Sequence, residues 1–320
     1  MVVITGATGL LGSILIDHFT SRKVPVTALY RTSPPAERAS VRWMEGDVTD
    51  IHALTKAFEG ARCVVHAAAL VSFAQRNKNK MFHVNVDGTA NVVNACLRAG
   101  VKRLVHISSV AALGKPANQK VIDEETPWPG SVKPSNYGQS KYLAELEAFR
   151  GEAEGLSVAM VNPSIILAAG HADRSSGKIF QYIYDGRPFY SDGQLNYVDA
   201  RDVAEMIYRL YENDSVKGRF IASAGTIPWK MLFGKIAKRF DKKPPSIKIS
   251  PTLAQWAAGV EWLRSSLTGR EPLITKETAR IARQRITYSN QKACNELAMT
   301  FRDLDNTLDW CCSHFLSSGP

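Results

Sequence analysis

The sequence lacks the features that mark secreted, fibrous or membrane-spanning proteins. It has only 5 Cys among 320 residues, none of them in a Cys-x-x-Cys pair, so no disulfide framework is indicated. Its 22 Gly and 15 Pro follow no period, which excludes a collagen-like chain. Charged residues interrupt every apolar run before it reaches the ~20 residues that a membrane-spanning helix needs.

A targeting segment is also missing from the first residues. Met1 leads directly into an apolar strand pattern, with no basic region or cleavage site before it. We therefore expect a cytoplasmic protein with reduced thiols. Because His66, His83 and His106 show no ligand spacing, no metal site is predicted.

The apolar pattern that is present predicts an α/β fold. Strands are expected over 2–4, 24–29, 41–44, 63–66, 104–107 and 158–161, and helices over 11–19, 51–58, 84–99, 203–211, 252–267 and 275–285. Continuous apolar strands that alternate with helices form a parallel sheet covered on both faces. The sequence thus predicts a Rossmann-type doubly wound parallel sheet over 1–165, with returning segments about 196–224. A smaller, mostly helical C-terminal lobe over 166–195 and 225–320 is expected to bind the substrate.

A glycine-rich turn joins the first strand to the first helix. The segment Gly6-Ala7-Thr8-Gly9-Leu10-Leu11-Gly12 lies there, which is the context in which such a motif binds a dinucleotide. The first glycine permits a tight turn, the second lets the pyrophosphate approach, and the third lets helix and strand pack closely. The helix N-terminus then offers free N–H groups and a positive dipole end to the phosphates.

The end of the second strand indicates which dinucleotide binds. Tyr30 takes the place of the acidic residue that would hold a ribose 2′-hydroxyl, and Arg31 follows it. A guanidinium can bind a 2′-phosphate, with Ser33 as a second donor, so NADP is favoured over NAD. Asp47, after the third strand, is a candidate for the adenine amino group. The alternative is that it caps the helix from Thr49 onward.

A tyrosine and a lysine four residues apart form the candidate catalytic pair. Tyr137 and Lys141 would share one face of a helix, and a nearby lysine favours the charged form of a tyrosine. Such a tyrosine can exchange a proton with an alcohol or carbonyl oxygen. Ser109 ends the fifth strand, where ligands bind in sheets of this kind, so it could hydrogen-bond the reacting oxygen.

These motifs resemble the extended short-chain dehydrogenase/reductases, the superfamily of NAD-dependent epimerases and dehydratases. The resemblance rests on TGATGLLG (5–12), GDVTD (46–50), HAAA (66–69), NVDGT (85–89), ISSVAALG (107–114), YGQSK (137–141), NPS (162–164) and YVDARDVA (197–204). The SSVAALG stretch and, more weakly, TGREP (268–272) point to the dihydroflavonol-reductase-like and 3β-hydroxysteroid-dehydrogenase-like branch.

The resemblance implies a role for each matching residue. Tyr137 would be the general acid/base, Lys141 would lower its pKa and bind the nicotinamide ribose, and Ser109 would orient the substrate oxygen, with Ser108 as the backup. The implied cofactor-binding residues are Gly6, Ala7, Thr8, Gly9, Leu10, Leu11, Gly12, Arg31, Asp47, Val48, Ala67, Ala68, Ala69, Tyr137, Lys141, Pro163 and Ser164. Asn85 would fix the strand–helix framework near the site or would be an ordinary buried polar residue. A homodimer is also implied.

Departures from the superfamily's patterns reduce the number of reactions that are expected for this chain. Sugar-nucleotide dehydratases of the superfamily carry an Asp-Glu pair where this chain has Val110 and Ala111, so dehydration is not expected. Epimerases that hold NAD⁺ tightly usually keep the strand-end acid that Tyr30 replaces. Asp123, Glu124 and Glu125 are interpreted as a solvated acidic run.

The predicted function is therefore NADP(H)-dependent reduction of a carbonyl, or oxidation of the alcohol, in a small hydrophobic or ring-containing substrate. One alternative is a nucleotide-sugar epimerase, which would return the hydride. The other is a non-catalytic NADP(H)-sensing protein, which would have little need of Tyr137. No nucleic-acid-binding motif is present.

The net charge of +10 is concentrated in one segment. Residues 229–292 contain fourteen Lys or Arg and four Asp or Glu. This excess would serve an anionic substrate, would attach the protein loosely to an anionic membrane together with Trp256 and Trp262, or would simply be solvated. Aromatic residues of the lobe, namely Tyr182, Tyr184, Phe189, Tyr190 and Trp229, suit a ring substrate, although most are expected to form the lobe's own core.

Overall fold

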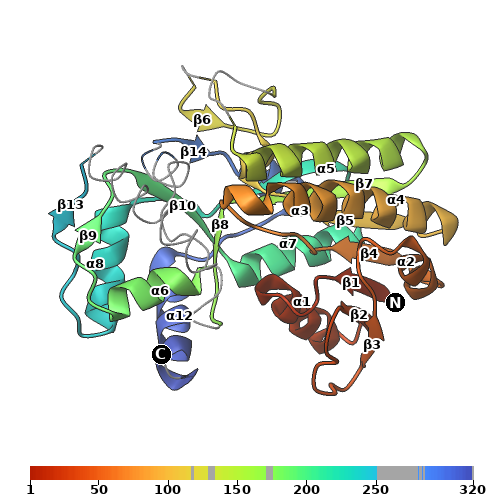
Figure 1. The fold of residues 1–320 in the computed structure, drawn as a ribbon, viewed down its shortest axis with the longest axis horizontal. Helices are drawn as coiled ribbons and strands as arrows, with labels where there is room; N and C mark the ends of the chain where they lie inside the picture. The colour runs from red at the N-terminus through yellow and green to blue at the C-terminus, as the bar shows by residue number, and fades with distance from the viewer. Residues whose placement is uncertain are drawn as a thin grey trace.

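Seven parallel strands form the central sheet of the protein. The computed structural model describes residues 1–116, 119–128, 134–170, 176–250, 280, 283 and 285–318. The strand order is β11 (Gly218–Ala222), β7 (Ser157–Pro163), β5 (Arg103–Ile107), β4 (Cys63–His66), β1 (Val2–Thr5), β2 (Val26–Tyr30) and β3 (Val41–Glu45). The chain crosses over at β1 and then winds outward in the other direction, as a doubly wound sheet does. The predicted Rossmann-type fold is confirmed (Figure 1).

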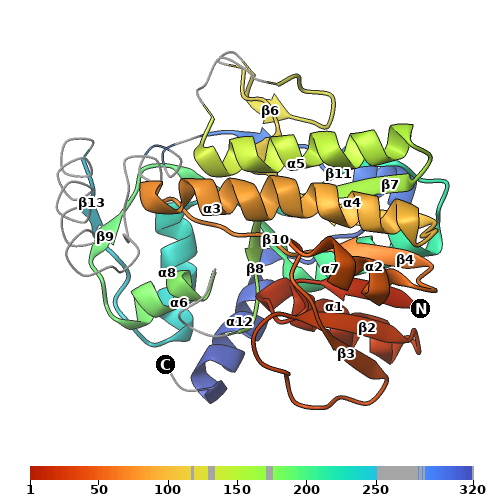
Figure 2. The same cartoon turned by 45° about the vertical axis from the view of Figure 1, so that its right-hand side comes forward.

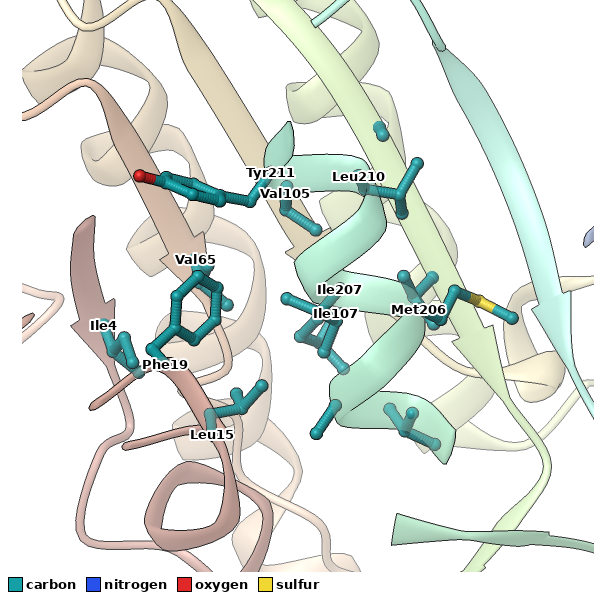
Figure 3. Packing of buried hydrophobic residues seen from close by; sticks show 14 of the residues in the cluster. Ile4, Leu15, Phe19, Val65, Val105, Ile107, Met206, Ile207, Leu210 and Tyr211 are labelled. Atoms are coloured by element: carbon teal, nitrogen blue, oxygen red, sulfur yellow. The ribbon is translucent and has the colours of Figure 1, made fainter. Parts of the chain in front are cut away.

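An apolar layer joins one face of the sheet to helices α1 (Leu10–Ser21) and α7 (Ala200–Glu212). Phe19, Ile207 and Leu210 lie here against Ile4 and other alternate strand residues, all buried (Figure 3). Strand side chains alternate between faces, so a continuous run of Val and Ile covers both faces of the sheet with apolar groups. Burial of that area is the main stabilising contribution.

The opposite face is covered by α2 (Ile51–Phe58), α4 (Gly88–Arg98) and α5 (Asn136–Ala153). Figure 2 shows α4 and α5 side by side over the sheet. The single helix predicted over 84–99 begins earlier than expected. It consists of α3 (Lys78–Phe82), a π-helical turn (His83–Asp87) and then α4.

A third apolar cluster lies beside the sheet and is built by α6 (Gly177–Tyr184), α8 (Trp229–Arg239) and α12 (Leu304–Ser318). These helices pack on a small sheet of β12 (Gly225–Pro228), β10 (Gln194–Asp199) and β8 (Ile165–Leu167). Tyr182, Tyr184 and Trp229 pack against this cluster. Most of the lobe aromatics that the structure describes therefore belong to its core, as the alternative interpretation expected.

Two short strand pairs complete the described fold. These are β9 (Phe189–Tyr190) with β13 (Ile247–Lys248), and β6 (Val121–Ile122) with β14 (Thr287–Tyr288). Helix α11 (Gln291–Leu297), in the range assigned to the lobe, packs on the central sheet through Ala293 and Leu297. The division into a cofactor domain and a substrate lobe stays a prediction.

The acidic run before α5 differs from the expectation. Glu124 is buried, and its Oε1 accepts a hydrogen bond of 2.8 Å from the Ile221 N–H. Burial raises the pKa of its carboxyl group. Only Asp123 and Glu125 are solvated, so the interpretation of a fully solvated run was wrong for Glu124.

Several predicted features fall on residues that are not described. The helices expected over 252–267 and 275–285 lie there almost entirely, together with Trp256, Trp262 and the TGREP stretch. In the described part of the chain, no helix is long and apolar enough to cross a membrane.

Candidate active site

The glycine turn after β1 is shaped by close backbone contacts. Gly6 has a φ of +68°, and a Cβ there would lie 2.6 Å from the Ala68 nitrogen. A Cβ on Gly12 would lie 2.2 Å from the Gly6 carbonyl oxygen. Both positions therefore require glycine for packing, whatever binds there. Gly9 is different, since its N–H closes the turn on the Gly6 oxygen at 3.0 Å and the residue is exposed.

Helix α1 begins directly after this turn, and the first N–H groups of the helix are uncapped. Gly9 is the N-cap, and no side chain of the described residues accepts a hydrogen bond at this helix start. Thr8 beside it is exposed. A helix end with free N–H groups attracts an anion such as a phosphate. The geometry thus fits the pyrophosphate site predicted for residues 6–12.

The ends of β2 and β3 bring Arg31 and Asp47 together. Arg31 Nε lies 3.8 Å from Asp47 Oδ2, and the arginine side chain is 63% exposed. Asp47 Oδ1 accepts hydrogen bonds of 2.9 Å from both the N–H and the hydroxyl of Thr49. The alternative role of Asp47 as the helix cap is wrong, because Asp50 caps α2 by accepting from the His52 and Ala53 N–H groups.

The loop after β4 is held by a buried asparagine. Asn85, on the π-helical turn, accepts from the Leu70 N–H at 2.8 Å and donates to the Leu70 carbonyl at 3.0 Å. Its amide also donates to the Ser140 hydroxyl of α5 at 2.9 Å. Asn85 therefore fastens the loop of Ala67, Ala68 and Ala69 to α5, which agrees with the framework role.

Val48 follows Asp47 after β3, and Pro163 and Ser164 lie at the end of β7. Val48 is buried against α4, where its carbonyl accepts from Asn91 Nδ2 at 3.1 Å. Pro163 ends β7, and the Ser164 N–H donates to the Ala222 carbonyl at 2.9 Å. All three therefore sit near the carboxyl edge of the sheet, where ligands bind in this fold.

Helix α5 presents Tyr137 to Ser109 in its first turn. The helix begins at the N-cap Ser135, whose hydroxyl accepts from the Gly138 N–H at 2.8 Å. A Cβ on Gly138 would lie 2.5 Å from the Ala111 carbonyl oxygen, so this helix start packs directly on the short turn that Ser109 caps. The first turn of α5, which carries Tyr137, is thereby set against Ser109, and the Ser109 hydroxyl acts to lower the pKa of the Tyr137 phenol.

The serine doublet is resolved by this geometry. Ser109 is half-buried and faces Tyr137, whereas Ser108 is buried and lies against the carboxyl group of Glu145. Ser109 is therefore the serine that the structure brings to Tyr137, and the backup position points elsewhere.

Lys141 lies one turn below Tyr137 and is almost fully buried. Its Nζ donates a hydrogen bond of 2.7 Å to the Ile107 carbonyl at the end of β5. Burial lowers the pKa of Lys141 to about 8, and the nearby Glu145 carboxylate acts in the other direction. The lysine therefore still carries a positive charge through most of the physiological range.

The lowering of the Tyr137 pKa by Lys141 stays a prediction, because burial sets the net direction of that pKa in this structure. Burial raises the pKa of Tyr137, and the Ser109 hydroxyl opposes that rise only in part. The Lys141 ammonium is directed to the Ile107 carbonyl. Tyr137 is thus held as a neutral phenol, the form that donates a proton.

Two strand histidines border the same region. His66 is bonded through its ring nitrogens to Thr5 Oγ1 at 2.8 Å and Thr89 Oγ1 at 3.1 Å. The His106 ring lies 5.2 Å from that of His66, and neither of its nitrogens has a hydrogen-bond partner among the described residues. Burial lowers the pKa of both, to about 3 for His66, so both are neutral. His66 is therefore hydrogen-bonded in the interior, whereas His106 is not bonded to any described residue.

Three residues near Tyr137 escaped the sequence interpretation. Phe73 packs edge-to-face on the Tyr137 ring with centroids 6.2 Å apart. Glu145 and Asn162 are fully buried and joined by a hydrogen bond of 2.5 Å. The signal for Glu145 was present, since it stands four residues after Lys141 and next to the apolar Ala144.

Comparisons with known proteins identify the family. The family model "NAD dependent epimerase/dehydratase family" matches residues 2–222. The chain belongs to this family, and it is an NAD(P)-dependent oxidoreductase of the extended short-chain type, as the resemblance predicted.

Curated relatives extend the comparison over most of the chain. A putative dihydroflavonol 4-reductase of Synechocystis is 28% identical over 92% of this chain and 89% of its own. Cinnamoyl-CoA reductase 1 of Oryza sativa is 28% identical over 78% of each. Sterol demethylase protein B of Methylococcus capsulatus is 26% identical over 84% of this chain and 82% of its own.

Solved structures confirm the fold over the whole length. The structure of gox2253 has a TM-score of 0.84 at 28% identity and covers 100% of this chain and 98% of its own. The enzyme WbmG of Bordetella bronchiseptica, solved with NAD and UDP, has a TM-score of 0.76 at 20% identity, with coverage of 99% and 94%. At that identity the second comparison speaks for the fold alone.

Proposed function

We propose that the protein reduces a carbonyl group to an alcohol with NADPH, or catalyses the reverse oxidation. The observation that carries the proposal is the packing of the first turn of α5, with Tyr137, on the turn that Ser109 caps, while Lys141 lies one helical turn further along. This places a neutral phenol, a hydroxyl group and a buried cation at the carboxyl edge of the sheet. A phenol and a hydroxyl that converge in this way can bind one carbonyl oxygen between them.

The described residues fit a dinucleotide. The exposed Gly9 turn and the uncapped start of α1 suit the pyrophosphate, and the small side chains of Ala67, Ala68 and Ala69 leave room beside them. Lys141 has donors to spare for ribose hydroxyls, because an ammonium has three and one is used. Bound NADPH would supply the hydride.

The work of the protein's own residues is then to bind the carbonyl and deliver a proton. Ser109 and Tyr137 would hold the substrate oxygen, and Tyr137 would give its phenolic proton to that oxygen as the negative charge develops. The raised pKa of Tyr137 keeps this proton in place until the substrate needs it. The cation of Lys141 would stabilise the tyrosinate that remains.

The choice of NADP over NAD rests on Arg31. Its side chain is largely exposed beside Tyr30, where no carboxylate ends the strand, and Asp47 at 3.8 Å keeps it near the end of β3. Because Asp47 Oδ1 already accepts two hydrogen bonds from Thr49, N–H groups of the Arg31 guanidinium remain available for a 2′-phosphate.

A ring-containing, hydrophobic substrate is supported by two observations. Phe73 lies edge-on to Tyr137, so one wall of the reacting centre is aromatic. Relatives across most of the chain are named as reductases of dihydroflavonol and cinnamoyl-CoA. Epimerisation of a nucleotide sugar is the alternative, and the experiment below separates the two.

The experiment is NADPH absorbance with a panel of aromatic ketones, steroids and nucleotide sugars. We expect net NADPH consumption with a ring ketone, a slower rate with NADH, and loss of turnover by orders of magnitude in Tyr137→Phe with NADPH binding retained. Tyr142→Phe is the matched control, because Tyr142 lies on the same helix and stacks on Trp128 instead. Near-normal turnover in Tyr137→Phe would refute the assignment, and an NADH preference would refute the role of Arg31.

The basic segment 229–292 is a weaker candidate for an anionic partner. Lys235 and Arg239 both pair with Asp305, and Lys248 pairs with Asp192 at 2.7 Å, so part of the excess is neutralised within the fold. Two further proposals are that the protein contacts an anionic membrane and that it forms a homodimer. Sedimentation with anionic vesicles at low salt tests the first, and sedimentation velocity tests the second.

A further inference from the structure

The buried face of α5 carries polar residues on three successive turns. Tyr137, Lys141 and Glu145 are spaced by four residues; Tyr137 is half-buried, and Lys141 and Glu145 are buried beside the apolar Ala144 and Ala148. Glu145 is 0% exposed. A buried carboxylate is costly unless other groups stabilise its charge, so its surroundings indicate what it does.

Residues of two strands lie against the Glu145 carboxyl group. Asn162 of β7 donates to Oε1 at 2.5 Å, and Arg219 of β11 lies 3.7 Å from Oε2. Oε2 and the buried Ser108 hydroxyl have no hydrogen-bond partner among the described residues. The contacts with Asn162 and Arg219 and the charge of Lys141 oppose the rise in the pKa of Glu145 that burial causes.

The asparagine that binds Glu145 also contacts Ser109. The side-chain amide of Asn162 that binds Glu145 also donates to the Ser109 carbonyl oxygen at 3.1 Å. Ser109 in turn caps the short turn on which the first turn of α5, with Tyr137, packs. Glu145 is therefore connected through one residue to the backbone that places Ser109.

Glu145 stands one helical turn after Lys141 on the same buried face of α5, and its charge favours the protonated lysine. The other titratable groups whose charges bear on the lysine are His66 of β4 and His106 of β5, and burial keeps both neutral. Tyr137, one turn above, is a neutral phenol. The Lys141 charge thus depends on Glu145, one turn further along the helix.

We propose that Glu145 is a positioning residue of the reaction, which keeps Lys141 charged beneath Tyr137 and, through Asn162, holds Ser109 in place. The proposal rests on the proposed function of Tyr137, Lys141 and Ser109. A purely structural Glu145 would tie α5 to β11 through Arg219 and would leave the ionisation of Lys141 unchanged.

The test compares Glu145→Gln with Glu147→Gln. The substitution Glu145→Gln keeps the size of the side chain and one acceptor but removes the charge. Glu147 lies on the same helix and pairs with Arg150 at 2.8 Å, away from Lys141. The first readout is the pH dependence of kcat/KM with the ketone found in the panel. The second is the titration of Lys141 in the protein alone, followed by NMR of ¹³Cε-labelled lysine and assigned with Lys141→Met.

Loss of the carboxylate charge makes the lysine easier to deprotonate. We expect the midpoint of the Lys141 titration, and the alkaline limb of kcat/KM, to move to lower pH by about one unit in Glu145→Gln. Glu145→Asp should restore most of the shift, and Glu147→Gln should match the wild type. A lower rate with unchanged midpoints would overturn the proposal and leave Glu145 a structural role.

Two further outcomes are separable. If the wild type oxidises no NADPH with any ketone, the proposed function fails, and the NMR titration still decides whether Glu145 governs Lys141. If Glu145→Gln does not fold, the double variant Lys141→Met/Glu145→Gln is made. Recovery of folding supports the pairing of the two charges, and failure of the double variant contradicts it.

Discussion

Two buried cations lie at opposite ends of strand β5, and the protein holds them in different ways. Arg103 begins the strand and is 0% exposed. Its guanidinium donates to three carbonyl oxygens, those of Leu210, Asp214 and Val216, at 3.1, 3.4 and 2.7 Å. Lys141 lies at the other end and donates to the Ile107 carbonyl.

The difference between them separates a structural cation from a functional one. Arg103 sits on the α7 side of the sheet, where carbonyl oxygens that end the helix or follow it accept its N–H groups. Its donors are largely used inside the fold. Lys141 keeps donors to spare at the edge of the sheet where ligands bind, and its lowered pKa makes its charge adjustable.

The largest effect is expected from removal of the functional cation. Lys141→Met should lower kcat/KM with NADPH by about 10²–10⁴-fold, because the tyrosinate and the ribose lose their partner. The fold should lose less stability than in Arg103→Met, because one carbonyl oxygen, that of Ile107, loses its donor rather than three. Turnover and urea unfolding, measured on the same preparation, check the activity and the stability. A Lys141→Met variant that is destabilised but active would show that Lys141 is the structural cation, which contradicts the comparison.

Removal of Arg103, the structural cation, should lower the stability of the fold and leave the activity of the folded protein unchanged. Arg103→Met leaves buried carbonyl oxygens without donors, so we expect unfolding to become easier by about 3 kcal/mol. The kcat of the molecules that remain folded should be unchanged. Denaturant titration, with activity normalised to the folded fraction, makes the measurement. A loss of kcat without loss of stability would contradict the comparison.

An exposed third cation, Arg31, should affect only the choice of cofactor. Arg31→Ser should raise the KM for NADPH by about 10–100-fold, the value of a charge-assisted hydrogen bond, and should leave the KM for NADH unchanged. Arg38→Ser is the matched control, because Arg38 is exposed in the same segment and pairs with Asp17. Equal effects on both cofactors would remove Arg31 from the 2′-phosphate site.

The smallest effect is the pH dependence of the wild type. Catalysis that needs a charged Lys141 should decline as the pH rises through about 8, the pKa of this group in the fold. Stability should move in the other direction. The folded pKa is lowered below the ordinary 10.5, so between these values the unfolded chain binds more protons and the fold gains stability with pH. Parallel pH series of kcat/KM and of urea midpoints check the two signs.

Local patterns in the sequence predicted the frame of the molecule well. The apolar runs predicted six of the seven strands of the central sheet and missed β11. The glycine turn is explained by contacts that no Cβ would permit at Gly6 and Gly12. The spacing of Tyr137 and Lys141 placed both on one helix face. These features depend on period and spacing, which a sequence carries directly.

Properties that depend on tertiary burial were not predictable in the same way. Glu124 was predicted to be solvated, but it is buried because the Ile221 N–H of β11, distant in sequence, donates a hydrogen bond to it. The pKa of Tyr137 was expected to fall because Lys141 is near in sequence, but burial raises it. The Asn162–Glu145 bond joins residues 17 apart on different elements.

The most direct test of the central claim follows the hydride with and without the Tyr137 phenol. A ring ketone from the panel is incubated with NADPH that carries deuterium at nicotinamide C4, and the alcohol is examined by mass spectrometry. We predict deuterium on the carbinol carbon with the wild type and Tyr142→Phe, and almost none with Tyr137→Phe. Equal labelling by Tyr137→Phe, or label recovered only in an epimerised nucleotide sugar without net loss of NADPH, would contradict the account.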